Sequence, residues 1–169
     1  VYTKHELKKM TDQISQCIDA GVDGIVSGAL TSTNTIDLKA LDSFLKVTQR
    51  LPFTFHRAIE SVYDIHESLE LLISHGINRI LFGGKSGNAF INRHELANIN
   101  RYINGRMTLL AGSGVHSGNV KELIQVAHLH EIHASAKYGS TKNDTVNEFD
   151  SDPVEVRKIV MALTKLREV

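Results

Sequence analysis

The sequence contains little cysteine, tryptophan or proline, and its charges cancel. Of its 169 residues one is cysteine, two are proline and none is tryptophan, while 19 basic side chains balance 19 acidic ones. Because Cys17 is alone, it can form neither an internal disulfide nor a paired thiolate site, and we predict a cytoplasmic protein. Zero net charge gives no general attraction to nucleic acid, and no apolar run reaches the roughly 20 residues of a membrane span. We therefore expect no nucleic-acid or membrane partner, and a single domain over residues 1–169.

The chain repeats one pattern, a short apolar run followed by an amphipathic stretch. Five runs have the length and β-branched character of strands, at residues 24–28, 53–57, 79–84, 108–114 and 131–135. Helical spacing of apolar residues occurs at 2–20, 38–49, 62–74, 93–102, 119–126 and 153–167. The strand ends lie 21 to 30 residues apart, close to the roughly 30 of a strand–helix–strand unit. This alternation predicts parallel strands covered by helices.

Several element boundaries have recognisable markers. Gly21, Gly76 and Gly105 follow predicted helices, where glycine takes the left-handed cap conformation without steric cost. Asp152 is expected to cap the last helix, with proline at its first position. Residues 137–151 contain few apolar side chains and are expected to form an exposed loop.

The fold class is α/β, and the strand ends distinguish two forms of it. In an open, doubly wound sheet only some strand ends bind ligands, whereas in a TIM (β/α)8 barrel all of them surround one mouth. Every run here ends in glycine or polar residues, which favours the barrel. Because such a barrel has eight strands, we predict an incomplete one with five visible strands, the missing three preceding the first.

The strand-end motifs resemble those of the copper homeostasis protein CutC family. The residues that carry the resemblance are 53–60 (FTFHRAIE), 24–30 with 36–37, 109–115 (LLAGSGV) with Asn119, and 131–136 (EIHASA). Their order and spacing agree, from about Tyr2 onward, with the later part of a CutC protein. The resemblance implies a cytoplasmic TIM-barrel protein associated with copper homeostasis, and copper as a possible bound ion.

Two departures from the family pattern stand out. The family's opening strands, with cysteines proposed for copper binding and a Pro-Arg-rich strand end, have no counterpart here. Residues 81–84 read Leu-Phe-Gly-Gly where the family usually has Thr-Ser-Gly. One hydroxyl of the family's pocket is therefore missing.

Four residues are candidates for catalysis: His56, Arg57, Glu60 and His133. Arginine binds carboxylate or phosphate through two hydrogen bonds, and histidine transfers protons near neutral pH. Because side chains alternate along a strand, only one of His56 and Arg57 can face the barrel axis directly. The structural alternative pairs Arg57 with Glu60 and binds His56 to a backbone carbonyl.

Four residues are candidates for anion binding: Gly112, Ser113, Gly114 and Ser135. The Gly-Ser-Gly run offers successive backbone N–H groups before a predicted helix, as in the phosphate-binding loops of TIM barrels. A short Gly-x-Gly also occurs wherever a strand turns tightly. His133 and Ser135 alternate with apolar residues and are expected to share one face, although a buried histidine bonded to neighbouring loops is the competing interpretation.

Two functions remain open. The resemblance implies a copper homeostasis protein that binds copper ion, whereas the strand ends suit a TIM-barrel enzyme of unknown reaction acting on a small anionic metabolite that bears phosphate or carboxylate. We assign no metal ligand, because Cu(I) prefers sulfur while Cys17 is expected in the core and the methionines are isolated at Met10, Met107 and Met161. The unpaired edges of an incomplete barrel also predict a homo-oligomer.

Overall fold

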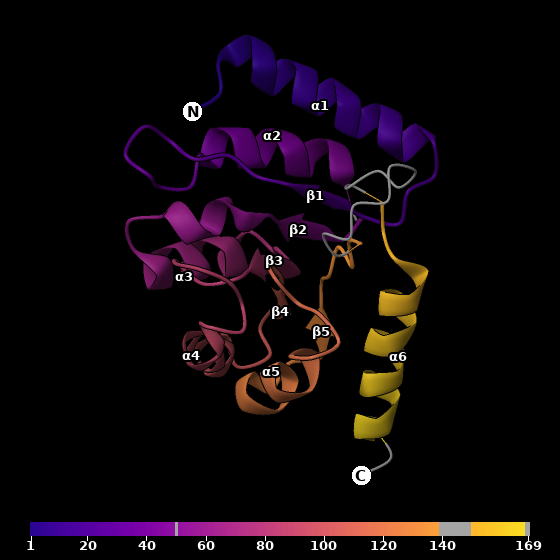
Figure 1. The fold of residues 1–169 in the computed structure, drawn as a ribbon. Coiled ribbons are helices and arrows are strands. Elements are labelled where there is room, and N and C mark those ends of the chain that lie inside the picture. Colours follow the sequence, from indigo (N-terminus) through magenta and orange to yellow (C-terminus); the bar gives the residue numbers. More distant parts are fainter. Residues whose placement is uncertain (50, 139–149, 168–169) are drawn as a thin grey trace. The chain divides into compact units, whose positions relative to one another are not determined.

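The computed structural model describes residues 1–49, 51–138 and 150–167 (Figure 1). Helices and strands alternate along the chain, as predicted. The elements are α1 (Lys4–Asp19), β1 (Ile25–Ser27), α2 (Leu38–Thr48), β2 (Phe53–Phe55), η1 (Arg57–Ser61), α3 (Ile65–Ser74), β3 (Arg79–Phe82), α4 (Arg93–Ile103), β4 (Thr108–Ala111), α5 (Val120–Ala127), β5 (Glu131–Ile132) and α6 (Pro153–Arg167). The strands form a parallel sheet in the order β1-β2-β3-β4-β5. This order confirms the predicted α/β class with five strands.

The chain divides into two compact units, which are described one at a time. The first comprises Val1–Phe82 with Ile103–Leu109, and the second comprises Gly83–Tyr102 with Leu110–Val169. The prediction of one domain over the whole chain stays a prediction.

In the first unit, β2 lies between β1 and β3. Phe53 pairs with Ile25 on one side, and Phe55 pairs with Ile80 on the other. Side chains that are at most 2% exposed fill the core against the helices: Leu41, Phe44, Phe53, Phe55, Ile59, Leu69, Leu72, Ile80 and Phe82. Burying each large apolar side chain contributes about 1.5–3 kcal/mol. Helix α1 packs beside α2 (Figure 1). The buried side chains of Phe53, Phe55 and Ile59 anchor β2 and η1 in this core.

The second unit contains the end of β4 from Leu110, strand β5, helix α4 up to Tyr102, and helices α5 and α6. Leu110 pairs with Glu131, and Ala111 with Ile132. The Asn100 amide of α4 donates to two carbonyls at the end of α5, those of Ala127 at 3.1 Å and His128 at 2.8 Å. Helix α5 in turn packs against α6. These contacts fix the segments that follow β4 and β5.

Helix boundaries largely follow the predicted markers. Thr3 and Glu6 form a capping box at α1, in which each side chain accepts the other residue's backbone N–H. Helix α6 begins at Pro153, as predicted. The carboxylate of Asp152, directly before the helix, accepts the N–H of Val154 at 2.8 Å. All three glycines expected after helices have positive φ: Gly21, Gly76 and Gly105.

All five strands end one to three residues earlier than predicted, and at β2 and β5 this changes the interpretation of candidate residues. Strand β2 ends at Phe55, because His56 caps η1 and Arg57 already belongs to that helix. His56 and Arg57 therefore do not alternate along a strand. Strand β5 ends at Ile132, so His133 and Ser135 follow the strand and the period-two argument does not apply to them.

The remaining differences concern a cysteine, a helix start and a loop. Cys17 is exposed, not in the core, because Ile14 is the buried residue of α1. Helix α3 begins at Ile65 instead of near residue 62, because Asp64 caps it. Of the predicted loop 137–151, residues 139–149 lie outside the described residues, while Lys137 and Ser151 form an antiparallel bridge. None of the described helices has the length and apolarity required to cross a membrane.

Candidate functional site

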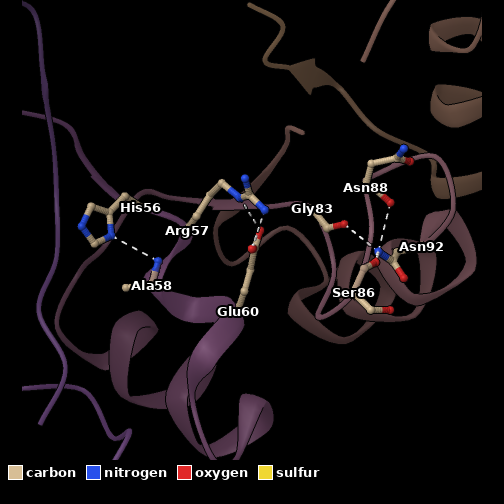
Figure 2. Close-up of polar contacts among 8 residues, drawn as sticks. All are labelled: His56, Arg57, Ala58, Glu60, Gly83, Ser86, Asn88 and Asn92. Carbon is tan, nitrogen blue, oxygen red and sulfur yellow. Dashed lines mark hydrogen bonds and ion pairs between the residues drawn. The ribbon is translucent and has the colours of Figure 1, made fainter. Parts of the chain in front are cut away.

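Arg57 and Glu60 form a close ion pair within η1, directly after β2 (Figure 2). Arg57 Nε donates to Glu60 Oε1 and Nη2 donates to Oε2, both at 2.8 Å. The hydrogen bonds to Glu60 raise the pKa of Arg57. The pairing of Arg57 with Glu60, which was the structural alternative to a catalytic role, is thus present. Glu60 uses one edge of the guanidinium, and the Nη1 side of the group lies outside this pair.

His56 is half-buried and held by its neighbours. Its Nδ1 accepts a hydrogen bond of 3.3 Å from the Ala58 N–H (Figure 2), and its ring meets that of Phe55 edge-on, with 5.7 Å between centroids. Burial lowers the pKa of His56, so the ring is neutral at pH 7 and the bond to Ala58 assigns its proton to Nε2. The backbone partner is an N–H, not the carbonyl considered from sequence. Nε2–H is then a donor for a carbonyl or phosphate oxygen.

Gly28, at the end of β1, makes room for this ring arrangement. A Cβ at Gly28 would lie 2.9 Å from the Phe55 ring and 3.0 Å from His56 Nδ1. Any larger residue would push both rings away. Packing against Gly28 therefore helps to set the position of the His56 ring.

The Gly-Ser-Gly run after β4 has an uncommon backbone. Ser113 has φ +90° and Gly114 has φ +65°, and a serine in this region costs about 1–2 kcal/mol. Neighbours hold it: Ala89 N–H donates to the Ser113 carbonyl at 3.0 Å, and the Asn119 amide donates to the Gly114 carbonyl at 2.8 Å. Strained segments that are held in this way occur preferentially at ligand sites.

A cleft of about 300 Å³ lies beside this run, within the second unit. Its walls come from the segment after β4, the segment after β5 and the start of α6: Gly114, Val115, His116, Ser135, Ala136, Lys137, Asp152 and Glu155. Ala136 also has positive φ, +45°, and its side chain is buried. The structure thus brings two predicted anion-binding residues, Gly114 and Ser135, to one cleft, with a strained segment on each side.

Two carboxylates in this cleft are already hydrogen-bonded. Glu155 accepts from Ser117, whose backbone N–H lies at 2.6 Å and whose Oγ lies at 3.0 Å. Asp152 accepts the Val154 N–H. His116 and Lys137 contribute basic groups to the same walls. The cleft therefore contains the basic groups of His116 and Lys137, while its two carboxylates already accept hydrogen bonds from the protein.

His133 is exposed and does not belong to the walls of this cleft. Its backbone N–H donates to the Ala111 carbonyl at 2.7 Å, which continues the β4–β5 pairing for one residue. The competing interpretation, a buried histidine, is wrong for this residue. The proposed catalytic residues His56, Arg57 and Glu60 belong to the first unit, whereas His133 and the anion-binding candidates belong to the second.

Sequence reasoning missed three residues that shape these segments: Asn92, Ala136 and Glu155. Asn92 binds backbone carbonyls of the loop directly before it, whereas Glu155 binds a loop 38 residues away in sequence. Only the position of Asn92 immediately before a helix could have marked it, since asparagine is common there. No sequence pattern distinguishes Ala136 or Glu155 from ordinary loop and surface residues.

The described residues do not fit a copper site. Within the described ranges, no group of three or more His, Cys, Asp or Glu side chains could hold a metal ion. Met10 and Cys17 do line one cleft of about 330 Å³ beside β1. Their spacing of seven residues along α1 separates their Cα atoms by about 10 Å, so both sulfur atoms could reach one Cu(I) only if the two side chains extended toward each other.

Comparison with known proteins connects this fold with one family. The model of the CutC family matches residues 1–138. A CutC family protein of Histophilus somni is 35% identical over 137 residues, which cover 81% of this chain and 56% of that protein. The copper homeostasis protein cutC homolog of Caenorhabditis elegans is 32% identical over 148 residues, which cover 88% of this chain and 59% of the relative. The chain thus spans little more than half the length of these relatives.

Solved structures agree with the sequence comparison. A crystal structure of CutC from Streptococcus agalactiae superimposes with a TM-score of 0.75 at 31% identity, covering 79% of this chain and 65% of that one. A mandelate racemase/muconate lactonizing enzyme from Polaromonas, at 11% identity and a TM-score of 0.68, shares the fold alone. The five parallel strands and their helices have a TIM-barrel-like arrangement, as predicted, and the chain belongs to the CutC family.

Proposed function

We propose that this chain functions in copper homeostasis, in the cytoplasm. The match of residues 1–138 to the CutC family carries the proposal, and the Caenorhabditis elegans relative is named for this role. The proposal treats copper as the ion whose level is controlled. It assigns no copper ligand among the described residues, where no group of three or more His, Cys, Asp or Glu side chains could hold a metal ion.

Cell growth and metal titration test this proposal separately. Bacteria that lack their own CutC should regain growth at elevated copper when they express this chain, and unchanged sensitivity to copper would contradict the proposed role. A Cu(I) titration under reducing conditions should show no stoichiometric binding that is lost in Cys17→Ser or Met10→Leu. Saturation that disappears in either variant would instead place copper in the cleft beside β1.

A second candidate function is the binding of a small anionic metabolite bearing phosphate or carboxylate. The observation that favours it is the cleft of the second unit, whose walls combine Gly114 and Ala136, both at positive φ, with the basic groups of His116 and Lys137. Strain that neighbours must maintain is expected where backbone N–H groups are held ready for a ligand. In the first unit, Arg57 and His56 Nε2–H are further donors to an anion, which is the basis for keeping His56, Arg57 and Glu60 as proposed catalytic residues.

Phosphate titration followed by NMR tests this second candidate. The amide resonances of Ser113, Gly114 and Ser135 should shift saturably with inorganic phosphate. The Arg57 Nε resonance reports separately on the first unit, so the two groups of donors can be told apart. If phosphate shifts only the resonances of lysines outside the cleft, or causes no saturable shift, the proposal of anion binding is contradicted. The expected homo-oligomer stays a prediction that sedimentation of the same samples can examine.

A further inference from the structure

The side chain of Asn92 closes the loop between β3 and α4. Its Nδ2 donates to the carbonyls of Gly83 at 2.9 Å and Asn88 at 3.0 Å, and also to that of Ser86 (Figure 2). The Asn92 backbone N–H donates to the Asn88 carbonyl as well, at 3.1 Å. Three carbonyls that lie along six residues of loop are thus gathered at the first turn of α4. The amide nitrogen carries two N–H donors, so one of them is shared between two of the three carbonyls.

The loop backbone is shaped to fit this amide. Gly84 has φ +90°, and a Cβ there would overlap the Asn92 Cβ and Cγ. No side chain other than hydrogen can occupy that position while Asn92 remains. The loop and the amide therefore form one packed unit, in which Asn92 is half-buried.

From this loop, two contacts reach the Gly-Ser-Gly run. Ala89 N–H donates to the Ser113 carbonyl at 3.0 Å, and Ala89 is fully buried. Gly114 lies so close to Asn88 that a Cβ on Gly114 would approach the Asn88 Cβ to 2.9 Å. The strained peptides at Ser113 and Gly114 are thus supported directly by residues 88 and 89, whose own position Asn92 fixes.

We propose that Asn92 is a positioning residue, which through residues 88 and 89 holds Ser113 and Gly114 in the conformation that an anionic ligand requires. The proposal rests on the anion site proposed above for the second unit. Asn92 itself touches no ligand. Its effect is to keep the Ser113 backbone at positive φ, where relaxation of an unsupported serine would otherwise turn the N–H groups away.

The decisive variant is Asn92→Asp, which keeps the shape of the side chain but replaces its donor by a carboxylate that faces three carbonyl oxygens. In this variant the Ala89 amide should exchange faster with solvent, and the φ-dependent coupling constant of Ser113 should change. The dissociation constant for inorganic phosphate should rise about tenfold or more. Asn98→Asp is the matched control, because it adds the same charge to the exposed face of α4, where Asn98 only accepts from Arg101. The control should change none of the three quantities.

The outcomes separate failure of the positioning role from failure of the anion site. If the unaltered protein binds no phosphate but Asn92→Asp still changes Ala89 exchange and the Ser113 coupling, the anion site is wrong and the support of the loop stands. If the unaltered protein binds phosphate and Asn92→Asp alters neither the two local measurements nor the affinity, the positioning role is overturned. Should Asn92→Asp not fold, Asn92→Ser removes the amide without adding charge, and the same criteria apply to it.

Discussion

Glu60 binds Arg57 through both of its carboxylate oxygens, and the two residues differ in how far they are buried. The Arg57 side chain is 48% exposed, whereas that of Glu60 is 14% exposed. Water can replace the partner of an exposed guanidinium but hydrates a nearly buried carboxylate poorly. The pair therefore stabilises the carboxylate more than the guanidinium, and the two halves of the pair are expected to respond differently to mutation.

Removing Arg57 should cost more stability than removing the charge of Glu60. We expect Arg57→Ala to lower the free energy of unfolding by about 1–2 kcal/mol and Glu60→Gln by less than about 1 kcal/mol. Chemical denaturation at pH 7 measures both. Lys8→Ala is the control, since Lys8 and Asp12 form a pair with side chains 74% and 56% exposed, and it should change stability little. Equal costs for Arg57 and Glu60 would contradict the argument from burial.

His56 should make the protein less stable as the pH falls below neutrality. Its pKa in the folded protein is lowered by burial, so the unfolded chain takes up the proton first, near pH 6.5. The contribution is fully present above pH 6.5 and is lost as the pH falls through the interval down to the lowered pKa. There, one proton changes the free energy of unfolding by at most about 1.4 kcal/mol per pH unit.

The measurement compares unfolding free energies at pH 7.5 and pH 5.5 for the unaltered protein and His56→Asn. The variant should show a smaller loss on acidification, because asparagine does not titrate. His94→Asn is the control, since His94 is exposed on α4. If His94→Asn reduces the pH dependence as much as His56→Asn does, His56 is not its source.

Much of the fold could be predicted because it depends on local patterns. Apolar periodicity placed the five strands and the α-helices α1 to α6 but not η1, and Gly21, Gly76 and Gly105 marked helix ends by a conformational property of the residue itself. The predicted end of β2 was wrong because a side chain binds the backbone there: His56 accepts the Ala58 N–H, and η1 begins where the strand was expected to continue. Such a bond competes with strand geometry, and no apolar pattern records it.

The candidate site could be predicted only as residue types at strand ends. That Gly114 and Ser135 share a cleft follows from the pairing of β4 with β5, which the alternating pattern implied. The supports of that cleft act over longer distances. Ser117 is bound by Glu155, 38 residues away, and two loop segments meet where Ala89 donates to Ser113. These contacts depend on tertiary structure, so the sequence alone offers no means to choose them.

Gly84 and Gly76 both have positive φ, but only Gly84 lies against another side chain. A Cβ at Gly76 would meet nothing within 4 Å, whereas at Gly84 it would overlap the Asn92 side chain. Gly76→Ala should therefore cost only the backbone strain of about 1–2 kcal/mol, and Gly84→Ala should cost about 1–3 kcal/mol more through overpacking. Thermal and denaturant unfolding measure the difference. Much of the extra cost should disappear when Gly84→Ala is combined with Asn92→Ala, and an additive double variant would show that the two residues do not clash.

Glu155 connects the start of α6 with the loop before α5, and this connection should weaken in acid. The hydrogen bond from the Ser117 N–H lowers the pKa of Glu155 below its usual value of 4.5. Its stabilising contribution is therefore present above pH 4.5 and is lost as the pH falls through the lowered pKa. The Ser117 amide proton, which donates at 2.6 Å, reports on this directly: its chemical shift should titrate with a midpoint below pH 4.5. In Glu155→Gln the titration should vanish, whereas Glu122→Gln, which alters an exposed carboxylate of α5 paired with Arg93, should preserve it. A midpoint at or above 4.5, or a titration that persists in Glu155→Gln, would mean that another acid controls the Ser117 amide.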